Sequence, residues 1–435
     1  MVNLKPVFCA APWAEGVLGS NGMFRPCAKL PDILKLDWRE IGLEKAFNSE
    51  AMRRFRQKII AGVPPHPICQ TCINTGMTRQ PEISLSKGCS VALFEIKRIN
   101  KTLDVTKLNT IYRILKYRLL SEESRKHISE YRSLCYSLAK DYPEISAYLG
   151  KLLKIVLICE SYLKQELTVT VIASLRQVSL KAKCNAKCIL CPGKYSGWIF
   201  SDAELDEKYY DEAFSHGDDI TDFFMNGAEY LFVKNWQEIT NRLKKVNAKP
   251  SISTNGILLT KRTIKYLIDN ESMNKLTISL DGGTKETIES IRVGVNFDIL
   301  MKNLDFLFRY VYEKKYSFTL DFAFVMMKRN YTELPEMIRL FSEMRSKVSS
   351  EKIYPILGFG CSSLDPDNVP GYNEFAAEEH MDSIDPERLR EIFDKCKEYS
   401  ETYGVSVGLF KEYSINSYIE AGYPIPKRAE HHIRG

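Results

Sequence analysis

Residues 184–191 read Cys184-Asn185-Ala186-Lys187-Cys188-Ile189-Leu190-Cys191 and place three thiols at spacings of four and then three residues. If this segment forms a loop, all three sulfur atoms can converge on one point. Three thiolates leave a four-coordinate metal, or one iron of a four-iron cluster, with an open position for a substrate or cofactor. The alternative is three core cysteines that happen to be close in sequence. The spacing favours a metal centre with one open position.

The overall composition is that of an ordinary globular protein. The chain has 435 residues, of which 44% are hydrophobic and 27% charged, and this length predicts two or three structural units. Its formal net charge of +6 permits an anionic substrate or partner. No arginine-rich stripe with interleaved aromatic residues stands out, so we expect no nucleic-acid partner.

Two features of the sequence indicate the compartment. The N-terminus lacks a basic region followed by a long apolar core, so we expect no secretory signal. The most apolar run, 152–163, is interrupted by Lys154 and Glu160 and is too short to span a bilayer. We therefore expect a cytoplasmic protein without a membrane partner. In a reducing compartment, its twelve cysteines favour metal or redox chemistry.

From about residue 168, short strand-like runs alternate with amphipathic helices. The predicted strands are 175–180, 221–225, 250–254, 276–280, 318–325 and 353–359, and the predicted helices lie near 202–215, 234–246, 260–269, 284–314, 331–348 and 386–403. Six strands, each followed by a helix, predict an α/β fold with a parallel sheet and helices packed outside it. The three cysteines follow the C-terminal end of the first strand, the edge where parallel α/β folds place their chemistry.

The N-terminal segment carries a second group of cysteines. Asn21-Gly22 between two apolar arms predicts a β-hairpin, with Cys9 before it and Cys27 just after it. A helix is predicted over about 40–60, and Cys69-Gln70-Thr71-Cys72 follows it. These four thiols could enclose a zinc ion or an iron–sulfur cluster, or they could be unligated core thiols. Spacing alone leaves the three possibilities open.

The segment between these two regions has no glycine between Gly88 and Gly150 and is predicted to be helical, with Cys135 and Cys159 as core residues. A further strand is possible at 405–409. The predicted parts are a small cysteine-rich module of β-hairpin and helix (1–88), a helical connector (89–167), the α/β domain (168–362), and a C-terminal helix and tail (363–435).

The three-cysteine spacing after a first strand, opening a repeated strand–helix unit, resembles the radical S-adenosylmethionine (SAM) superfamily. Later strand ends carry further segments that look like motifs of that superfamily. These are Asn226-Gly227-Ala228-Glu229, which is similar to its Gly-Gly-Glu segment, Ser253-Thr254-Asn255-Gly256, Ile278-Ser279-Leu280-Asp281-Gly282, and Ile291-Arg292 followed by Gly294.

The resemblance implies a partial (β/α)6 barrel and a [4Fe–4S] cluster held by Cys184, Cys188 and Cys191. It also implies reductive cleavage of SAM, electrons from a reductase such as flavodoxin or ferredoxin, and a 5′-deoxyadenosyl radical that takes hydrogen from a peptide side chain, a sugar or a small metabolite. The implied SAM contacts are Asn226, Gly227 and Glu229 for the amino group, Ser253, Asn255, Ser279 and Asp281 for the ribose or carboxylate, and Arg292 for the carboxylate.

Each of these residues also has a purely structural interpretation. Glu229 could be a solvated acid at a helix start, the polar residues at the strand ends could serve turns, and Arg292 could lie on the surface. Cys361, after the sixth predicted strand, is a candidate hydrogen-atom donor, although a packed thiol is the simpler interpretation.

The N-terminal segment has a resemblance of its own. Cys9-x2-Pro12-Trp13, Gly22, Pro26-Cys27, Arg56 and Cys69-x2-Cys72 resemble a SPASM or twitch auxiliary module. That resemblance implies a second [4Fe–4S] cluster on Cys9, Cys27, Cys69 and Cys72. A zinc-stabilised module is an alternative.

A different class of function is a non-catalytic iron–sulfur carrier or binding module that keeps the fold. It is suggested by Leu190, where the superfamily usually has an aromatic residue, and by Asn226 in place of glycine.

Overall fold

The computed structural model describes two compact units of the chain. They comprise residues 1–180, 203–225 and 237–250 (first unit) and residues 181–202, 226–236 and 251–435 (second unit). The described residues are 8–27, 30–74, 93, 96–97, 99–104, 106, 122–171, 174–197, 199, 202–215, 224–225, 228–245, 249–316, 318–346, 356–363, 371–380, 383–403, 406–409 and 413–414.

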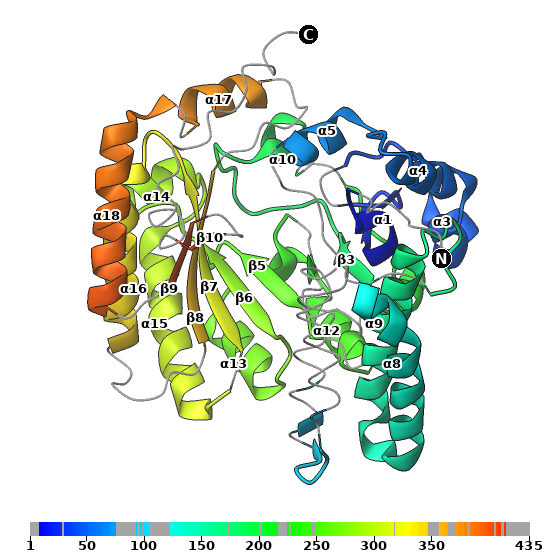
Figure 1. Cartoon of the computed structure of the whole chain (residues 1–435). Coiled ribbons are helices and arrows are strands. Elements are labelled where there is room, and N and C mark those ends of the chain that lie inside the picture. Colours follow the sequence, from blue (N-terminus) through cyan, green and yellow to red (C-terminus); the bar gives the residue numbers. More distant parts are fainter. Residues whose placement is uncertain are drawn as a thin grey trace. The chain divides into compact units, whose positions relative to one another are not determined.

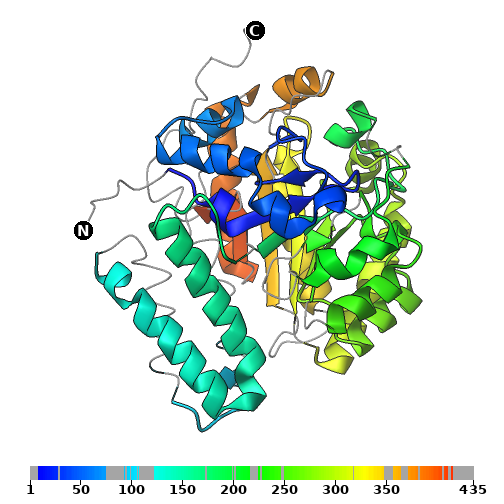
Figure 2. The same ribbon diagram turned by 90° about the vertical axis from the view of Figure 1, so that its right-hand side faces the viewer.

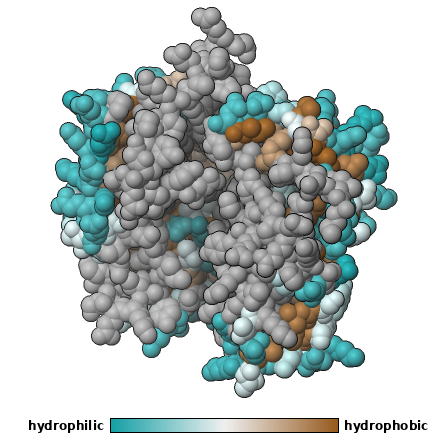
Figure 3. Space-filling model, viewed as in Figure 1, coloured by the Kyte–Doolittle hydropathy of each residue, from teal (hydrophilic) through white to brown (hydrophobic). Residues whose placement is uncertain are grey.

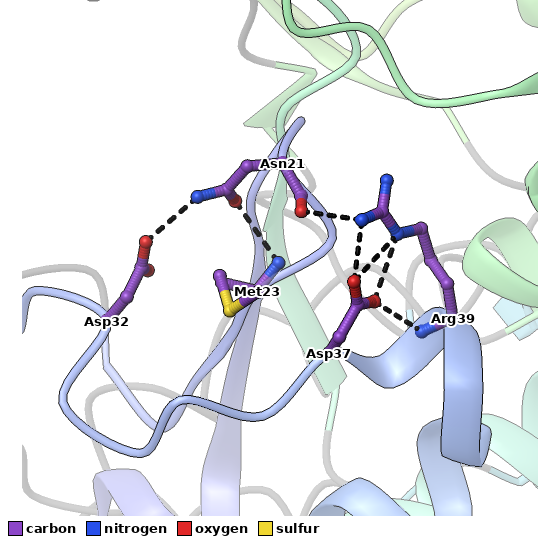
Figure 4. Close-up of polar contacts among 5 residues, drawn as sticks. All are labelled: Asn21, Met23, Asp32, Asp37 and Arg39. Carbon is purple, nitrogen blue, oxygen red and sulfur yellow. Dashed lines mark hydrogen bonds and ion pairs between the residues drawn. The ribbon is translucent and has the colours of Figure 1, made fainter.

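The predicted N-terminal hairpin is present in the first unit. Strands β1 (Glu15–Leu18) and β2 (Phe24–Arg25) pair antiparallel, with Leu18 opposite Phe24. At the turn, Arg39 donates to the Asn21 carbonyl at 2.8 Å, and Asn21 donates to Asp32 at 2.9 Å (Figure 4). These bonds fix the turn against the chain that follows it.

The hairpin extends a parallel sheet, which the sequence pattern did not reveal. Strand β1 lies parallel to β3 (Ser174–Val178), and β3 lies parallel to β4 (Phe224–Met225). All four β1 residues are buried. A register shift between Gly16 and Val17 interrupts the β1–β3 ladder. The first unit therefore contains the strand order β2-β1-β3-β4.

The stretch 40–60 is helical as predicted, but three helices rather than one occupy it. They are α2 (Trp38–Ile41), α3 (Leu43–Phe47) and α4 (Glu50–Ile60). Gly42, at φ +83°, separates the first two, and the Ser49 side chain caps α4 by accepting from the Met52 nitrogen. The short helix α1 (Ala11–Ala14) precedes β1, and α5 (Pro67–Asn74) carries Cys69 and Cys72.

The described part of the connector is helical, as predicted. Helices α8 (Glu122–Asp141) and α9 (Ser146–Leu163) lie antiparallel side by side (Figure 2) and are joined by a 3-10 turn that begins at Pro143. Cys135 and Cys159 are buried in the core between them, which confirms their predicted place. Most of residues 75–121 lie outside the described residues.

The second unit confirms the α/β class and the parallel sheet. Its strand order is β5-β6-β7-β8-β9-β10, and only the last pair is antiparallel. The strands are β5 (Ser251–Thr254), β6 (Lys275–Ser279), β7 (Thr319–Met326), β8 (Ile356–Ser363), β9 (Ser406–Leu409) and β10 (Tyr413–Ser414). Along β7 buried and half-buried residues alternate, so one face of this strand forms core.

Helices of the second unit lie along one side of its sheet (Figure 1). They are α13 (Lys261–Asp269), α14 (Lys285–Ile291), α15 (Phe297–Lys314), α16 (Leu334–Ser346) and α18 (Pro386–Tyr403). The single helix predicted over 284–314 is wrong, because the chain leaves the helix after Ile291 and Asn296 caps α15. This break is where the site residue Arg292 lies.

Hydrophilic residues line the edge of the molecule formed by α18 (Figure 3). Among the helices built from described residues, none has the length and apolar character that crossing a membrane requires.

Candidate functional site

The cysteine loop of residues 184–191 is held by the segment that follows α14. The Lys187 nitrogen donates to the Val293 carbonyl at 2.7 Å. The Ile189 nitrogen donates to the Ile291 carbonyl at 2.9 Å. A Cβ placed on Gly294, at φ +96°, would lie 3.2 Å from the Asn185 carbonyl oxygen. The two segments therefore pack backbone to backbone, about 100 residues apart in sequence.

The three thiols lie close enough together for their charges to interact. Burial raises the pKa of the Cys184 thiol to about 11, and the Glu229 carboxylate and the other two thiols add to that rise. Cys188 is buried, whereas Cys184 and Cys191 are half-buried. The Cys184 sulfur also accepts from the Ala186 nitrogen at 3.4 Å, a contact that suits a thiolate.

Within the described part of the chain, no three His, Cys, Asp or Glu side chains meet at one point as a single-ion site requires. An iron–sulfur cluster does not require that arrangement, because each thiolate binds a different iron. The three thiols of this loop, whose charges interact, could each bind one iron of such a cluster.

Glu229 is buried beside this loop, with 1% of its surface exposed. Its Oε2 accepts from the Asn255 nitrogen at 2.9 Å, and its own nitrogen donates to the Lys183 carbonyl at 3.1 Å. Burial raises the pKa of this carboxyl to about 6, against the effect of the Asn255 bond and the Arg292 charge. Glu229 does begin a short 3-10 helix, η4 (Tyr230–Phe232), but it is not solvated.

Asn255 joins the end of β5 to the cysteine loop. Its Nδ2 donates to Oδ1 of Asn185 at 2.7 Å, while its Oδ1 accepts from the Ile257 nitrogen at 3.1 Å. Asn255 therefore serves the turn and contacts the loop at once. Ser253 of β5 is exposed and lies opposite Thr277 of β6, two residues before the half-buried Ser279.

Asp281 and Arg292 form a buried ion pair of 2.6 Å, and the Asp281 side chain is 0% exposed. Arg292 also donates from Nη1 to the Cys188 sulfur at 3.8 Å. Its Nε is buried and has no acceptor among the described residues. Burial raises the pKa of the Asp281 carboxyl, and the Arg292 charge opposes that rise. Arg292 is therefore a site residue rather than a surface one.

Three predicted residues cannot be placed fully. Asn226 and Gly227 lie outside the described residues. Cys361 is in β8, paired with Phe324 of β7, but its side chain is outside the described part. The proposed roles of these three residues stay predictions.

Sequence reasoning missed an aromatic group that packs on the cysteine loop. Ile189 and Leu190 pack against a core cluster that includes Tyr372 of helix α17 (Tyr372–Glu379). Tyr195, four residues after Cys191, stacks on Phe375 of the same helix with ring centres 6.1 Å apart. The Tyr195 hydroxyl also donates to the Ile189 carbonyl at 3.0 Å. No motif marks α17, so no sequence signal could have found it.

The N-terminal cysteines lie in the first unit. Cys9, Cys27, Cys69 and Cys72 are all half-buried. Burial raises the pKa of the Cys69 thiol to about 11, and the Cys27 and Cys72 thiols add to that rise. Three of the four predicted ligands therefore lie near one another.

Comparison with known families matches residues 178–341 to the family model described as Radical SAM superfamily. This stretch is a radical SAM domain. The domain contains the cysteine loop, Glu229, Asn255, Asp281 and Arg292, and it excludes the four N-terminal cysteines.

Searching the curated proteins returned no match to the chain. Among solved structures the chain is similar to Streptococcus suis SuiB bound to S-adenosylmethionine, with 14% identity and a TM-score of 0.42 over 71% of this chain and 66% of that one. Streptococcus suis SuiB bound to precursor peptide SuiA is 15% identical to the chain, with a TM-score of 0.43 over 64% of this chain and 56% of that one. A radical SAM methyltransferase from Sphaerobacter thermophilus is 13% identical, with a TM-score of 0.37 over 55% of this chain and 66% of that one. The chain spans less than two thirds of each of these structures.

Proposed function

We propose that this protein is an enzyme that reductively cleaves SAM and abstracts hydrogen from a substrate. The observation that carries the proposal is the cluster of three interacting thiols beside the buried Glu229, inside the radical SAM domain. Cys184, Cys188 and Cys191 would hold a [4Fe–4S] cluster. When bound, the cluster and SAM supply the electron transfer that cleaves the sulfonium carbon–sulfur bond and yields the 5′-deoxyadenosyl radical.

In this proposal the chain's own residues bind SAM and fix its orientation. With a pKa of about 6, Glu229 is mostly ionised at neutral pH and is suited to accept from an ammonium group. The buried Nε of Arg292 is a donor aimed at no described acceptor, which suits a carboxylate. Asn226, Gly227, Ser253, Asn255 and Ser279 complete the proposed SAM contacts. Asp281, whose side chain is fully buried and pairs with Arg292, belongs to the same proposed set of contacts to the ribose or carboxylate.

Helix α17 and Tyr195 cover the apolar side of the cysteine loop. An apolar wall excludes water from reactive intermediates. This packing also accounts for Leu190, which lies among apolar side chains rather than in solvent.

Anaerobic reconstitution of the full chain tests the proposal. The variant Cys184→Ala/Cys188→Ala/Cys191→Ala should lose about four iron atoms per chain and all formation of 5′-deoxyadenosine. Cys396→Ala, which removes a buried thiol of α18 in the same unit, should retain both. If the triple variant still cleaves SAM, the proposal is wrong.

We further propose a second, auxiliary [4Fe–4S] cluster on Cys9, Cys27, Cys69 and Cys72. The interaction among Cys27, Cys69 and Cys72 supports it. Iron, sulfide and zinc analysis of the full chain separates this cluster from a zinc site. Cys69→Ala/Cys72→Ala should lose about half of the iron. Loss of zinc with unchanged iron would instead indicate a zinc site.

The proposal includes a partial (β/α)6 barrel over 168–362, a reductase such as flavodoxin or ferredoxin, and a peptide or small-molecule substrate. Tracing deuterium from candidate substrates into 5′-deoxyadenosine identifies the carbon that is attacked.

A non-catalytic iron–sulfur carrier is the rival function, suggested by Leu190 and Asn226. Equilibrium titration of SAM decides between them, because a carrier should bind none.

A further inference from the structure

One thiol of the cysteine loop is in contact with a buried cation. Arg292 donates from Nη1 to the Cys188 sulfur at 3.8 Å and pairs through Nη2 with Asp281 at 2.6 Å. Cys188 is 8% exposed and Asp281 is 0% exposed. The three groups therefore form a chain of charges away from solvent, in which the guanidinium lies between the carboxylate and the sulfur.

Asp281, the partner of Arg292, is itself held in place by the sheet. Asp281 follows β6, and its Oδ1 accepts from the Val325 nitrogen of β7 at 2.7 Å, so the sheet fixes the carboxylate. The Asn330 side chain donates to the Asp281 carbonyl at 2.9 Å. A planar guanidinium that one partner orients presents its other nitrogens in fixed directions. With Nη2 at the carboxylate, Nη1 lies 3.8 Å from the Cys188 sulfur.

We propose that Asp281 is a positioning residue that holds Arg292 against the Cys188 thiolate and thereby raises the reduction potential of the cluster bound there. This inference rests on the proposed function. Reduction adds one negative charge to a cluster, and nearby cations and hydrogen bonds to its sulfurs favour the reduced form. The guanidinium of Arg292 lies between the Cys188 sulfur and the Asp281 carboxylate, so the cation is the nearer of the two charges to the sulfur.

Potentiometric titration of the reconstituted holoprotein, followed by electron paramagnetic resonance and without SAM, is the test. Arg292→Gln removes the cation and should lower the potential, decreasing the reduced fraction at a fixed poise by roughly threefold to tenfold. Lys285→Gln removes the same charge from the exposed start of α14, where Lys285 pairs with Asp298. Solvent screens that site, so this control should leave the potential unchanged.

Asp281→Asn gives the discriminating result. If Asp281 acted only through its own charge, its removal would leave Arg292 in place and raise the potential. If Asp281 positions Arg292, the guanidinium is released and the potential falls in spite of the lost negative charge. A fall supports the inference, and a rise or no change overturns it. If Asp281→Asn retains no iron, the reduction potential of Asp281→Glu is measured instead, because glutamate keeps the charge but moves it. A fall in that potential supports the inference, and a rise or no change overturns it.

The outcome is separable from that of the proposed function. A wild-type chain that assembles no cluster on Cys184, Cys188 and Cys191 would defeat the proposed function itself. A chain that assembles the cluster and cleaves SAM, but whose potential ignores Asp281→Asn, would defeat this inference alone.

Discussion

The backbone nitrogen of Asn255 donates a hydrogen bond of 2.9 Å to Oε2 of Glu229, 26 residues earlier in the chain. This bond joins the residue after β5 to the residue that begins η4. It holds the Glu229 carboxylate in place, and it favours the ionised form that burial opposes. The pH dependence of the free energy of unfolding reports the balance between burial, which raises the pKa of Glu229, and this hydrogen bond, which lowers it.

Glu229→Gln should remove one component of that pH dependence. The pKa of Glu229 rises from 4.5 to about 6 on folding, so between these values the folded chain holds a proton that the unfolded chain has released. As pH rises through this window, the free energy of unfolding of the wild type should therefore fall by about 2 kcal/mol more than that of Glu229→Gln. Urea unfolding at pH 4.5 and pH 7 measures it. The exposed Glu286→Gln is the control, and a pH-independent difference between wild type and Glu229→Gln would contradict the argument.

Gly294→Ala should loosen the cysteine loop. The added Cβ would crowd the Asn185 carbonyl oxygen at 3.2 Å and would sit on a backbone at φ +96°. Gly197→Ala shares the positive φ, at +73°, but nothing lies within 4 Å of its Cβ. Both variants should lose about 1 kcal/mol to backbone strain.

The crowding at Gly294 should add to that loss and should also lower iron per chain after reconstitution. Iron analysis and denaturant unfolding of the two variants measure the difference. Equal iron content in both would show that this close approach does not shape the loop.

Arg56→Lys should destabilise the N-terminal segment. Arg56 is 0% exposed; its Nε and Nη2 donate to the Pro12 carbonyl, and its Nη1 donates to the Leu167 carbonyl at 2.7 Å. Lysine keeps the charge but lacks the fork that reaches both carbonyls. We expect a loss of about 2–4 kcal/mol, since hydrogen bonds from charged groups contribute about 1.5–3 kcal/mol each.

Arg54→Lys is the matched control on the same helix. Arg54 is exposed and pairs with Glu50 one turn away, so its replacement should change stability by less than about 0.5 kcal/mol. Thermal or denaturant unfolding compares the two. A loss at Arg56 no larger than that at Arg54 would refute the assigned role.

Gly22→Ala should open the hairpin turn. Gly22 has φ +80°, and a Cβ there would overlap the guanidinium of Arg39, which binds Asn21 and Asp37 (Figure 4). The added methyl should cost more in wild type than in an Arg39→Ala background, where the overlap is gone. A double-mutant cycle of unfolding free energies measures this coupling. Additive effects of the two changes would argue against the overlap.

Local pattern predicted most elements of the α/β part. Period-two and period-3.6 hydrophobicity placed β6, β7 and α18 within one or two residues, because these elements bury one face along their whole length. The breaks at Gly42 and after Ile291 were missed. There the hydrophobic period continues across the break, and the backbone conformation of one or two residues interrupts the helix.

The pairing of β1 with β3 was also missed. The two strands are about 155 residues apart, and a parallel partner at that distance leaves no mark on either strand's own pattern. The same holds for α17, whose aromatic residues gain meaning only from their contact with Tyr195.

The spacing of Cys184, Cys188 and Cys191 after a strand is a local property, so the amino-acid sequence alone located the candidate cluster. The environment of those thiols came from the tertiary structure. From sequence, Asp281 and Arg292 were implied SAM contacts that could equally have been a turn residue and a surface residue. In the structure, Arg292 contacts Cys188, 104 residues earlier in the chain, and pairs with Asp281. Burial and charge pairing depend on which strands lie side by side, and hydrophobic periodicity carries no information about that order.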